Sequence, residues 1–309
     1  MAGLSIADLP LPDDHYRPDL STRRLDGVIN FEQIDAAYIE DKQRACLLSA
    51  TAVGQNESLL QQETIDLAKR LLRNSRGDTL SATLASASYV REPRIKVAGA
   101  VWKLHEDNPD VPVATVTLIP RGLKVPSSKL LKVDPRIICN AVKSDLNRAG
   151  GKEADGWFIG FIHGENDPGT DTDVPHMHGM VGGGMIDVVD RLRHQPKYAS
   201  HRPKGSDVGE PLCQRVRISR GPLTNLPDPI TYILQSYWPA RWSGDVGGGS
   251  VKRTRRKHRI PEPHHTEVLL WLDQWKLSDL CILVGLRVTK TGLKATKSTA
   301  NTYSNGTTK

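Results

Sequence analysis

The chain has 309 residues, of which 38% are hydrophobic and 25% are charged. This composition is typical of a folded globular protein with one large or two modest domains, and it argues against disorder over the whole length. Lysine and arginine outnumber aspartate and glutamate by 42 to 35, so the net charge is +7, which favours an anionic partner such as nucleic acid.

The residue pattern argues against a membrane-spanning protein, a secreted protein and a protein with a cysteine-based zinc or redox site. A transmembrane helix needs about 18 consecutive apolar residues, and no such run occurs. The first residues lack the basic start and apolar run of a signal peptide. No two cysteines form a Cys-x-x-Cys pair, so no zinc ribbon or redox pair is predicted. We expect a cytoplasmic protein with reduced thiols at Cys46, Cys139, Cys213 and Cys281.

The N-terminal part of the chain is predicted to be an arm followed by helices. Residues 1–25 are rich in proline and aspartate and have no clear period, which is typical of an extended arm. Residues 30–74 have helical spacing, and the stronger helix begins near Glu57 with an apolar stripe of about 3.6-residue period. Residues 75–78 end this helix.

The central block, residues 111–240, is predicted to form a sheet with helices on one face. Alternating β-branched residues predict strands at 113–119, 156–165, 174–181 and 215–219. Asp134 followed by Pro135 predicts the start of a helix. The expected helices span residues 134–149, 185–193 and 226–238. Both hairpin and crossover connections occur, which indicates an α+β fold with an antiparallel sheet.

The composition changes after Pro239. A Gly-rich stretch is followed by a densely basic run, residues 252–259, and by an amphipathic, helical stretch from Glu267 to about Leu286. The end of the chain is rich in Thr, Ser, Asn and Lys and is predicted to be disordered. We therefore expect four regions: an N-terminal arm and helical region (1–85), a central domain (86–243), a basic linker with an amphipathic helical segment (244–289) and a disordered tail (290–309).

The most informative motif is a pair of histidines. Residues 174–181 read Val-Pro-His-Met-His-Gly-Met-Val, and in a strand His176 and His178 point to the same face. Neutral imidazole is the commonest metal ligand, so this spacing predicts half of a divalent metal site. Such a site needs a third ligand. Glu165 is one candidate, because it ends the strand expected to pair with the histidine strand; His163 lies two residues before it on the same face.

The helix expected at 226–238 supplies a candidate nucleophile. Its buried stripe falls on positions three and four residues apart, which include Tyr237, whereas Tyr232 lies off the stripe. A phenol on the polar side of a helix can reach a phosphodiester held by a metal. Tyr232 is therefore the predicted nucleophile, and Tyr237 is its rival.

The order of these elements resembles the HUH endonucleases, which include rolling-circle replication initiators, conjugative relaxases and single-tyrosine transposases. The resemblance covers residues 111–240, from the strand at 113–119 through the His-hydrophobe-His strand to the tyrosine helix. It implies a ferredoxin-like or RRM-like antiparallel sheet. It also implies nicking of single-stranded DNA with Mg²⁺ or Mn²⁺ and a 5′-phosphotyrosine intermediate.

Carried over residue by residue, the resemblance makes His176 and His178 metal ligands and Tyr232 the nucleophile. Many replication initiators have a lysine three residues after the tyrosine, where this chain has Gln235. In the transposase branch a glutamine near the tyrosine binds the metal, usually one position later. The third ligand therefore stays open between Glu165 and Gln235.

The expected partner is single-stranded DNA at an origin or at the end of a plasmid, phage or other mobile element. The basic run is expected to contact phosphates without reading the sequence. Its cations are Lys252, Arg253, Arg255, Arg256, Lys257 and Arg259. No Gly-x-x-x-x-Gly-Lys-Ser/Thr motif occurs, so a helicase would be a separate protein, and no membrane contact is expected.

Two further classes stay open on the residues alone. One is another His-dependent phosphoesterase, although Gly179 and Met180 provide no third histidine like that of histidine-triad nucleotide hydrolases. The other is a non-catalytic nucleic-acid-binding protein on an RRM-like sheet. That class is disfavoured because the strands lack the paired exposed aromatic residues that usually bind RNA.

Overall fold

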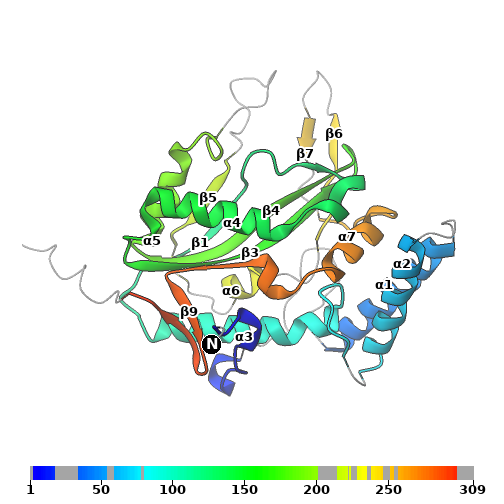
Figure 1. Cartoon of the computed structure of the whole chain (residues 1–309), viewed down its shortest axis with the longest axis horizontal. Helices are drawn as coiled ribbons and strands as arrows, with labels where there is room; N and C mark the ends of the chain where they lie inside the picture. Colours follow the sequence, from blue (N-terminus) through cyan, green and yellow to red (C-terminus); the bar gives the residue numbers. More distant parts are fainter. Residues whose placement is uncertain are drawn as a thin grey trace, which may run out of the picture.

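An antiparallel sheet with helices on both sides forms the centre of the molecule (Figure 1). The computed structural model describes residues 3–17, 34–53, 59–77, 80–200, 214–221, 223, 228–234, 238–245, 251–253 and 257–297. No helix within these ranges is long and apolar enough to cross a bilayer. Three of the four cysteines lie in these ranges, and they are free thiols: Cys46, Cys139 and Cys281.

The sheet has the strand order β5-β1-β4-β3-β8, and the short β2 pairs with β4. Its strands are β1 (Val113–Leu118), β2 (Val125–Pro126), β3 (Gly156–Asp167), β4 (Thr172–Gly183), β5 (Val216–Ser219) and β8 (Cys281–Val284). Every pairing in this sheet is antiparallel. The predicted α+β class is confirmed, and each of the four strands predicted in the central block is present.

The longest strands, β3 and β4, form a hairpin that positions the histidines. Its turn is stabilised at Asp167, whose side chain accepts a hydrogen bond from the Gly169 N–H at 3.2 Å. Asp171 has a φ of 49°, a left-handed conformation that aspartate tolerates better than most residues. Because this turn sets the register, His163 of β3 lies opposite His176 of β4.

Helices α4 (Pro135–Leu146) and α5 (Met185–Arg191) cover one side of the sheet (Figure 1). The predicted start of α4 is confirmed, because the Asp134 side chain accepts a hydrogen bond from the Arg136 N–H at 2.8 Å. On the other side lie α6 (Asp228–Tyr232) and α3 (Ala87–Glu106). The helices therefore cover both faces, although the sequence predicted one.

Helix α6 is shorter than the helix predicted at 226–238. Pro239 prevents a helix from continuing past Trp238, but α6 already ends at Tyr232, well before it. The chain instead pairs with the free edge of β3, where the Asn166 N–H donates to the Pro239 carbonyl at 3.0 Å. Ala240 then bridges both Asn166 and His258.

The C-terminal segment departs most from the prediction. The expected helix from Glu267 to Leu286 is wrong beyond Asp273, because residues 281–284 are an edge strand of the sheet. The start of the tail is a hairpin rather than disordered, since Leu293 is buried. A separate hairpin comes first in this segment and consists of β6 (Ser243–Asp245) and β7 (Val251–Arg253). It is followed by α7 (His264–Asp273), the 3₁₀ turn η6 (Leu277–Leu280), β8, and the hairpin of β9 (Leu286–Thr289) and β10 (Gly292–Ala295).

The predicted N-terminal helical region is present as α1 (Ile34–Val53) and α2 (Leu59–Asn74), after two 3₁₀ turns, η1 (Ile6–Asp8) and η2 (Asp14–Tyr16). Helix α3 was not predicted, because Pro93 and Gly99 interrupt its helical pattern. Asp41 of α1 stabilises the start of α3 by accepting a hydrogen bond from the Ala87 N–H at 2.7 Å.

Candidate metal centre and tyrosine

Three buried histidines meet on the face of the sheet opposite α4 and α5. His163, His176 and His178 each offer a ring nitrogen, and these atoms all lie within 4.8 Å of one another. The side chains are 4%, 5% and 7% exposed. Among the described residues this is the one such group of three or more potential ligands. The predicted histidine pair therefore does lie in a possible three-histidine metal site.

Hydrogen bonds orient two of the rings. The Nδ1 of His176 lies 2.9 Å from the Val174 carbonyl, and because a carbonyl only accepts, this nitrogen carries the proton. The Nδ1 of His178 lies 3.0 Å from the Thr117 hydroxyl, which can donate a hydrogen bond to it. The two Nε2 atoms lie 3.1 Å apart, and since the proton of His176 is on Nδ1, its Nε2 accepts a hydrogen bond from the Nε2–H of His178. A cation bound at the rings would take the place of the proton between these two nitrogens, and the contacts at the Nδ1 atoms are of the kind that orient metal-binding histidines.

The positive groups around the site favour neutral imidazole rings and would attract an anionic ligand. Burial is the main reason why the pKa of His178 lies well below its usual range. Nearby positive groups lower this pKa further; they are His176, Lys257, Arg217 and Arg241. Neutral imidazole is the form that binds a metal. The surrounding cations would attract an anionic group such as a phosphodiester.

The donor set fits a divalent cation. Three imidazoles suit a borderline transition metal better than Mg²⁺, which prefers oxygen ligands, so Mn²⁺ is the better match of the two predicted metals. The residues that would hold it are His163, His176 and His178.

Neither predicted alternative for the third ligand joins this group in the described structure. The carboxylate of Glu165 forms an ion pair with Arg241, with an Oε1–Nε distance of 3.2 Å. Gln235 lies outside the described residues. His163 takes the third position instead. The hairpin register could have indicated it, because a short turn between the predicted strands places His163 opposite His176.

Tyr232 lies at the histidine site. Its ring centroid is 5.0 Å from that of His178, and the side chain is 38% exposed. The neighbouring apolar residues of the helix, Ile230 and Ile233, are buried, as the predicted stripe requires. The rival, Tyr237, lies outside the described residues. The buried Arg94 of α3 anchors this end of α6 by donating to the Thr231 carbonyl at 3.0 Å.

The basic run divides into residues with different roles. The ammonium group of Lys257 lies 5.3 Å from the Tyr232 ring centroid, so Lys257 belongs to the site. Arg259 points elsewhere, because its guanidinium binds both carboxylate oxygens of the buried Glu40. Of the other predicted DNA contacts, only the backbone of Lys252 and Arg253 is described, and Arg255 and Arg256 lie outside the described residues.

No protein-family model, curated protein or solved structure matches this chain. The resemblance to the HUH endonucleases therefore rests on the order of the motifs, the antiparallel sheet and the three histidines.

Proposed function

We propose that the protein is an HUH-type endonuclease that nicks single-stranded DNA and becomes linked to the 5′ end through Tyr232. The observation that carries this proposal is the 5.0 Å separation between the rings of Tyr232 and His178, with Tyr232 partly exposed. A nucleophile and a phosphate-binding metal must lie within a few ångströms of one phosphodiester, and the closeness of Tyr232 to the histidines supports this role.

The side chains would divide the work as follows. The three histidines would hold a divalent cation, which when bound supplies a positive charge that polarises a phosphate oxygen. Lys257, over the Tyr232 ring, would stabilise negative charge on the phenol oxygen and the adjacent phosphate. Arg217 and Arg241, whose charges reach His178, would attract the DNA backbone.

The proposed reaction exchanges one phosphodiester for another. The Tyr232 oxygen gives up its proton to solvent and forms a bond to phosphorus, while the bond from phosphorus to the 3′ oxygen breaks. The 3′ oxygen takes a proton and leaves as a hydroxyl. Because the phosphodiester is retained on tyrosine, the step is reversible. The free 3′-hydroxyl could prime replication or rejoin, which suits a protein acting at an origin or at the end of a mobile element.

The nucleophile is tested by incubating the protein with end-labelled single-stranded DNA and Mn²⁺ and looking for a covalent adduct. Tyr232→Phe should remove the adduct and leave folding and DNA binding intact, because it deletes one oxygen from a partly exposed side chain. Tyr89→Phe on α3 is the matched control and should retain the adduct. An adduct that persists in Tyr232→Phe and disappears in Tyr237→Phe would make the rival tyrosine the nucleophile.

The metal site is tested with the His176→Ala/His178→Ala double variant. Cleavage should fall by at least about 100-fold, since loss of the cation removes stabilisation of the developing charge. Undiminished cleavage would reject the site. If the wild type and all tyrosine variants cleave DNA but none forms an adduct, the protein is a phosphoesterase that uses water as the nucleophile. If the protein binds DNA tightly and does not cleave it, it is a non-catalytic DNA-binding protein.

A further inference from the structure

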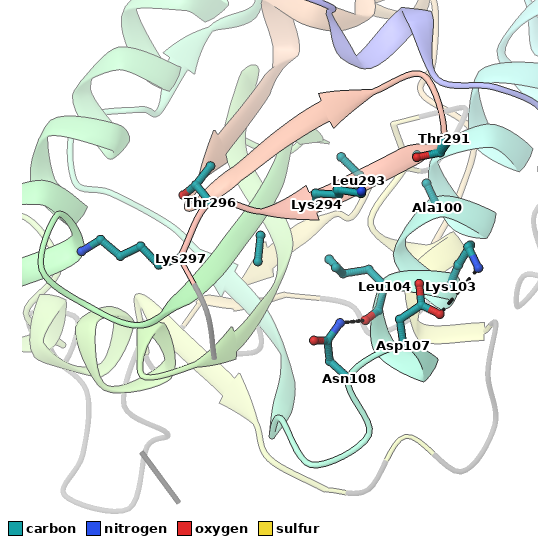
Figure 2. Close-up of a pocket in the computed structure, with 12 residues that line it drawn as sticks. Ala100, Lys103, Leu104, Asp107, Asn108, Thr291, Leu293, Lys294, Thr296 and Lys297 are labelled. Atoms are coloured by element: carbon teal, nitrogen blue, oxygen red, sulfur yellow. Dashed lines mark hydrogen bonds and ion pairs between the residues drawn. The ribbon is translucent and has the colours of Figure 1, made fainter. Parts of the chain in front are cut away.

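A second feature with the character of a binding site lies away from the histidines, between α3 and the β9–β10 hairpin (Figure 2). A cavity of about 510 Å³ lies here, and a second cavity of about 300 Å³ adjoins it beside the N-terminal arm. The two share four lining residues, Ala100, Lys103, Thr291 and Gly292, so they lie next to each other. We call it the hairpin groove.

The hairpin groove is lined by four lysines, Lys103, Lys290, Lys294 and Lys297. Its acidic residues are Asp13 and Asp107. Asp107 pairs with Lys103 at 3.5 Å, but both side chains are about half exposed, so this pair is weak. In the described part of the chain, no ion pair involves Lys290 or Lys294. The groove therefore carries excess positive charge.

The hairpin register places one of the groove lysines beside another cation, an arginine that does not line the groove. Lys294 of β10 lies directly opposite Arg287 of β9, and both residues are exposed. Like charges opposite each other on paired strands destabilise a hairpin. An anion bound in the groove at Lys294 would reduce this repulsion.

The shape of the groove suits an extended, amphipathic anion. The buried Leu104 and Leu293 form its apolar base, while Lys103 lies toward one end and Lys297, whose ammonium group donates to the Lys152 carbonyl, toward the other (Figure 2). The side chain of Asn108 lies beside Leu104, to whose carbonyl it donates a hydrogen bond at 2.8 Å. Apolar surface with cations along its length matches a nucleic-acid strand, whose bases are apolar on their faces and whose phosphates are charged.

We infer that the hairpin groove binds the single-stranded DNA that flanks the nick, an inference that rests on the proposed function. Helix α3 contributes to both the tyrosine site and the hairpin groove, because its Arg94 binds the Thr231 carbonyl beside Tyr232 and its Lys103 lines the groove. Arg94 and Lys103 are nine residues apart, which is about 13.5 Å along the helix axis. The two residues lie on different sides of the helix, so a strand leaving Tyr232 must also pass around α3.

The test is the salt dependence of binding, measured by fluorescence anisotropy with oligothymidylates of about 10 and about 30 nucleotides and without divalent metal. In Lys290→Gln/Lys294→Gln, the slope of log affinity against log salt for the longer strand should become shallower by about 1.4, or about 0.7 for each lost phosphate contact. The Lys42→Gln/Lys69→Gln variant removes the same charge from α1 and α2, at the far end of the molecule, and should leave the slope unchanged.

An equal change of slope in both double variants would show a general effect of net charge and would overturn the inference. An unchanged slope in the groove variant would also overturn it. The adduct assay is read separately, because the groove residues do not contact the tyrosine site. Normal adduct formation with an unchanged slope would reject the groove alone. A groove-dependent slope with no adduct in the wild type would reject the proposed nuclease and leave DNA binding in the groove.

Discussion

At the scale of single residues, the candidate metal centre depends on a hydroxyl in the neighbouring strand. Thr117 of β1 lies opposite His178 of β4, and its oxygen is 3.0 Å from the Nδ1 of that histidine. This contact fixes the orientation of the His178 ring and leaves its Nε2 facing His176. The role of Thr117 is therefore to orient a metal ligand through a hydrogen bond.

Thr117→Val should weaken Mn²⁺ binding by about 10–100-fold, because it keeps the shape of the side chain and removes the hydrogen-bond partner of His178. Isothermal titration of Mn²⁺ into the protein measures this change. Thr115→Val, two residues earlier on the same face of β1 and opposite Met180, is the matched control and should bind Mn²⁺ normally. Equal affinities in the two variants would mean that the hydroxyl does not orient the ligand.

At the scale of elements, helix α1 holds the segment that carries Lys257. Glu40 of α1 is fully buried and binds both Arg44 and Arg259. Burial of the carboxylate raises the pKa of Glu40, but the charges and hydrogen bonds of the two arginines together outweigh this effect, so the pKa lies below its usual value. Arg259, which follows Lys257 by two residues, thus links the histidine site to the N-terminal helices.

Arg259→Gln should destabilise the fold by about 3 kcal/mol, the lower end of the range for breaking a buried pair, because Glu40 keeps Arg44. It should leave the salt slope of DNA binding unchanged. Lys257→Gln should do the opposite, with little change in stability and a slope shallower by about 0.7. Urea unfolding and anisotropy separate the two effects. A shallower slope in Arg259→Gln with normal stability would restore Arg259 as a DNA contact.

At the scale of the whole molecule, a buried acid makes stability depend on pH. Burial is the main cause that raises the pKa of Asp173 to about 6, and the charge of Glu267 adds to it. Hydrogen bonds from Asn166 and Ser127 and the charge of His264 act in the opposite direction. The folded state therefore prefers the protonated acid at a pH where the unfolded chain, with a pKa near 3.8, is already ionised.

This contribution is fully present below about pH 4, declines as the pH rises toward 6 and is lost above it. The difference of about two pKa units corresponds to about 3 kcal/mol. Asp173→Asn cannot ionise, so its free energy of unfolding, relative to wild type, should increase by about that amount between pH 4 and pH 7. Urea unfolding at several pH values measures it, and a difference independent of pH would contradict the assignment.

The sequence by itself determined the features that depend on neighbouring residues. Alternation placed His176 and His178 on one face, the Asp134–Pro135 pair began α4, and the apolar stripe left Tyr232 exposed. Each of these follows from backbone geometry over a few residues, which is why a linear pattern predicts them.

Only the tertiary structure decided the features that depend on distant segments. The register of the hairpin brings His163 to the other two histidines. Arg259 pairs with Glu40 of α1, which lies more than 200 residues away in the sequence. Residues 281–284 form a strand because they pair with the edge of β3. In each case the energy comes from a partner that the local sequence does not contain. A buried charge needs an opposite charge, and a strand edge needs a second strand.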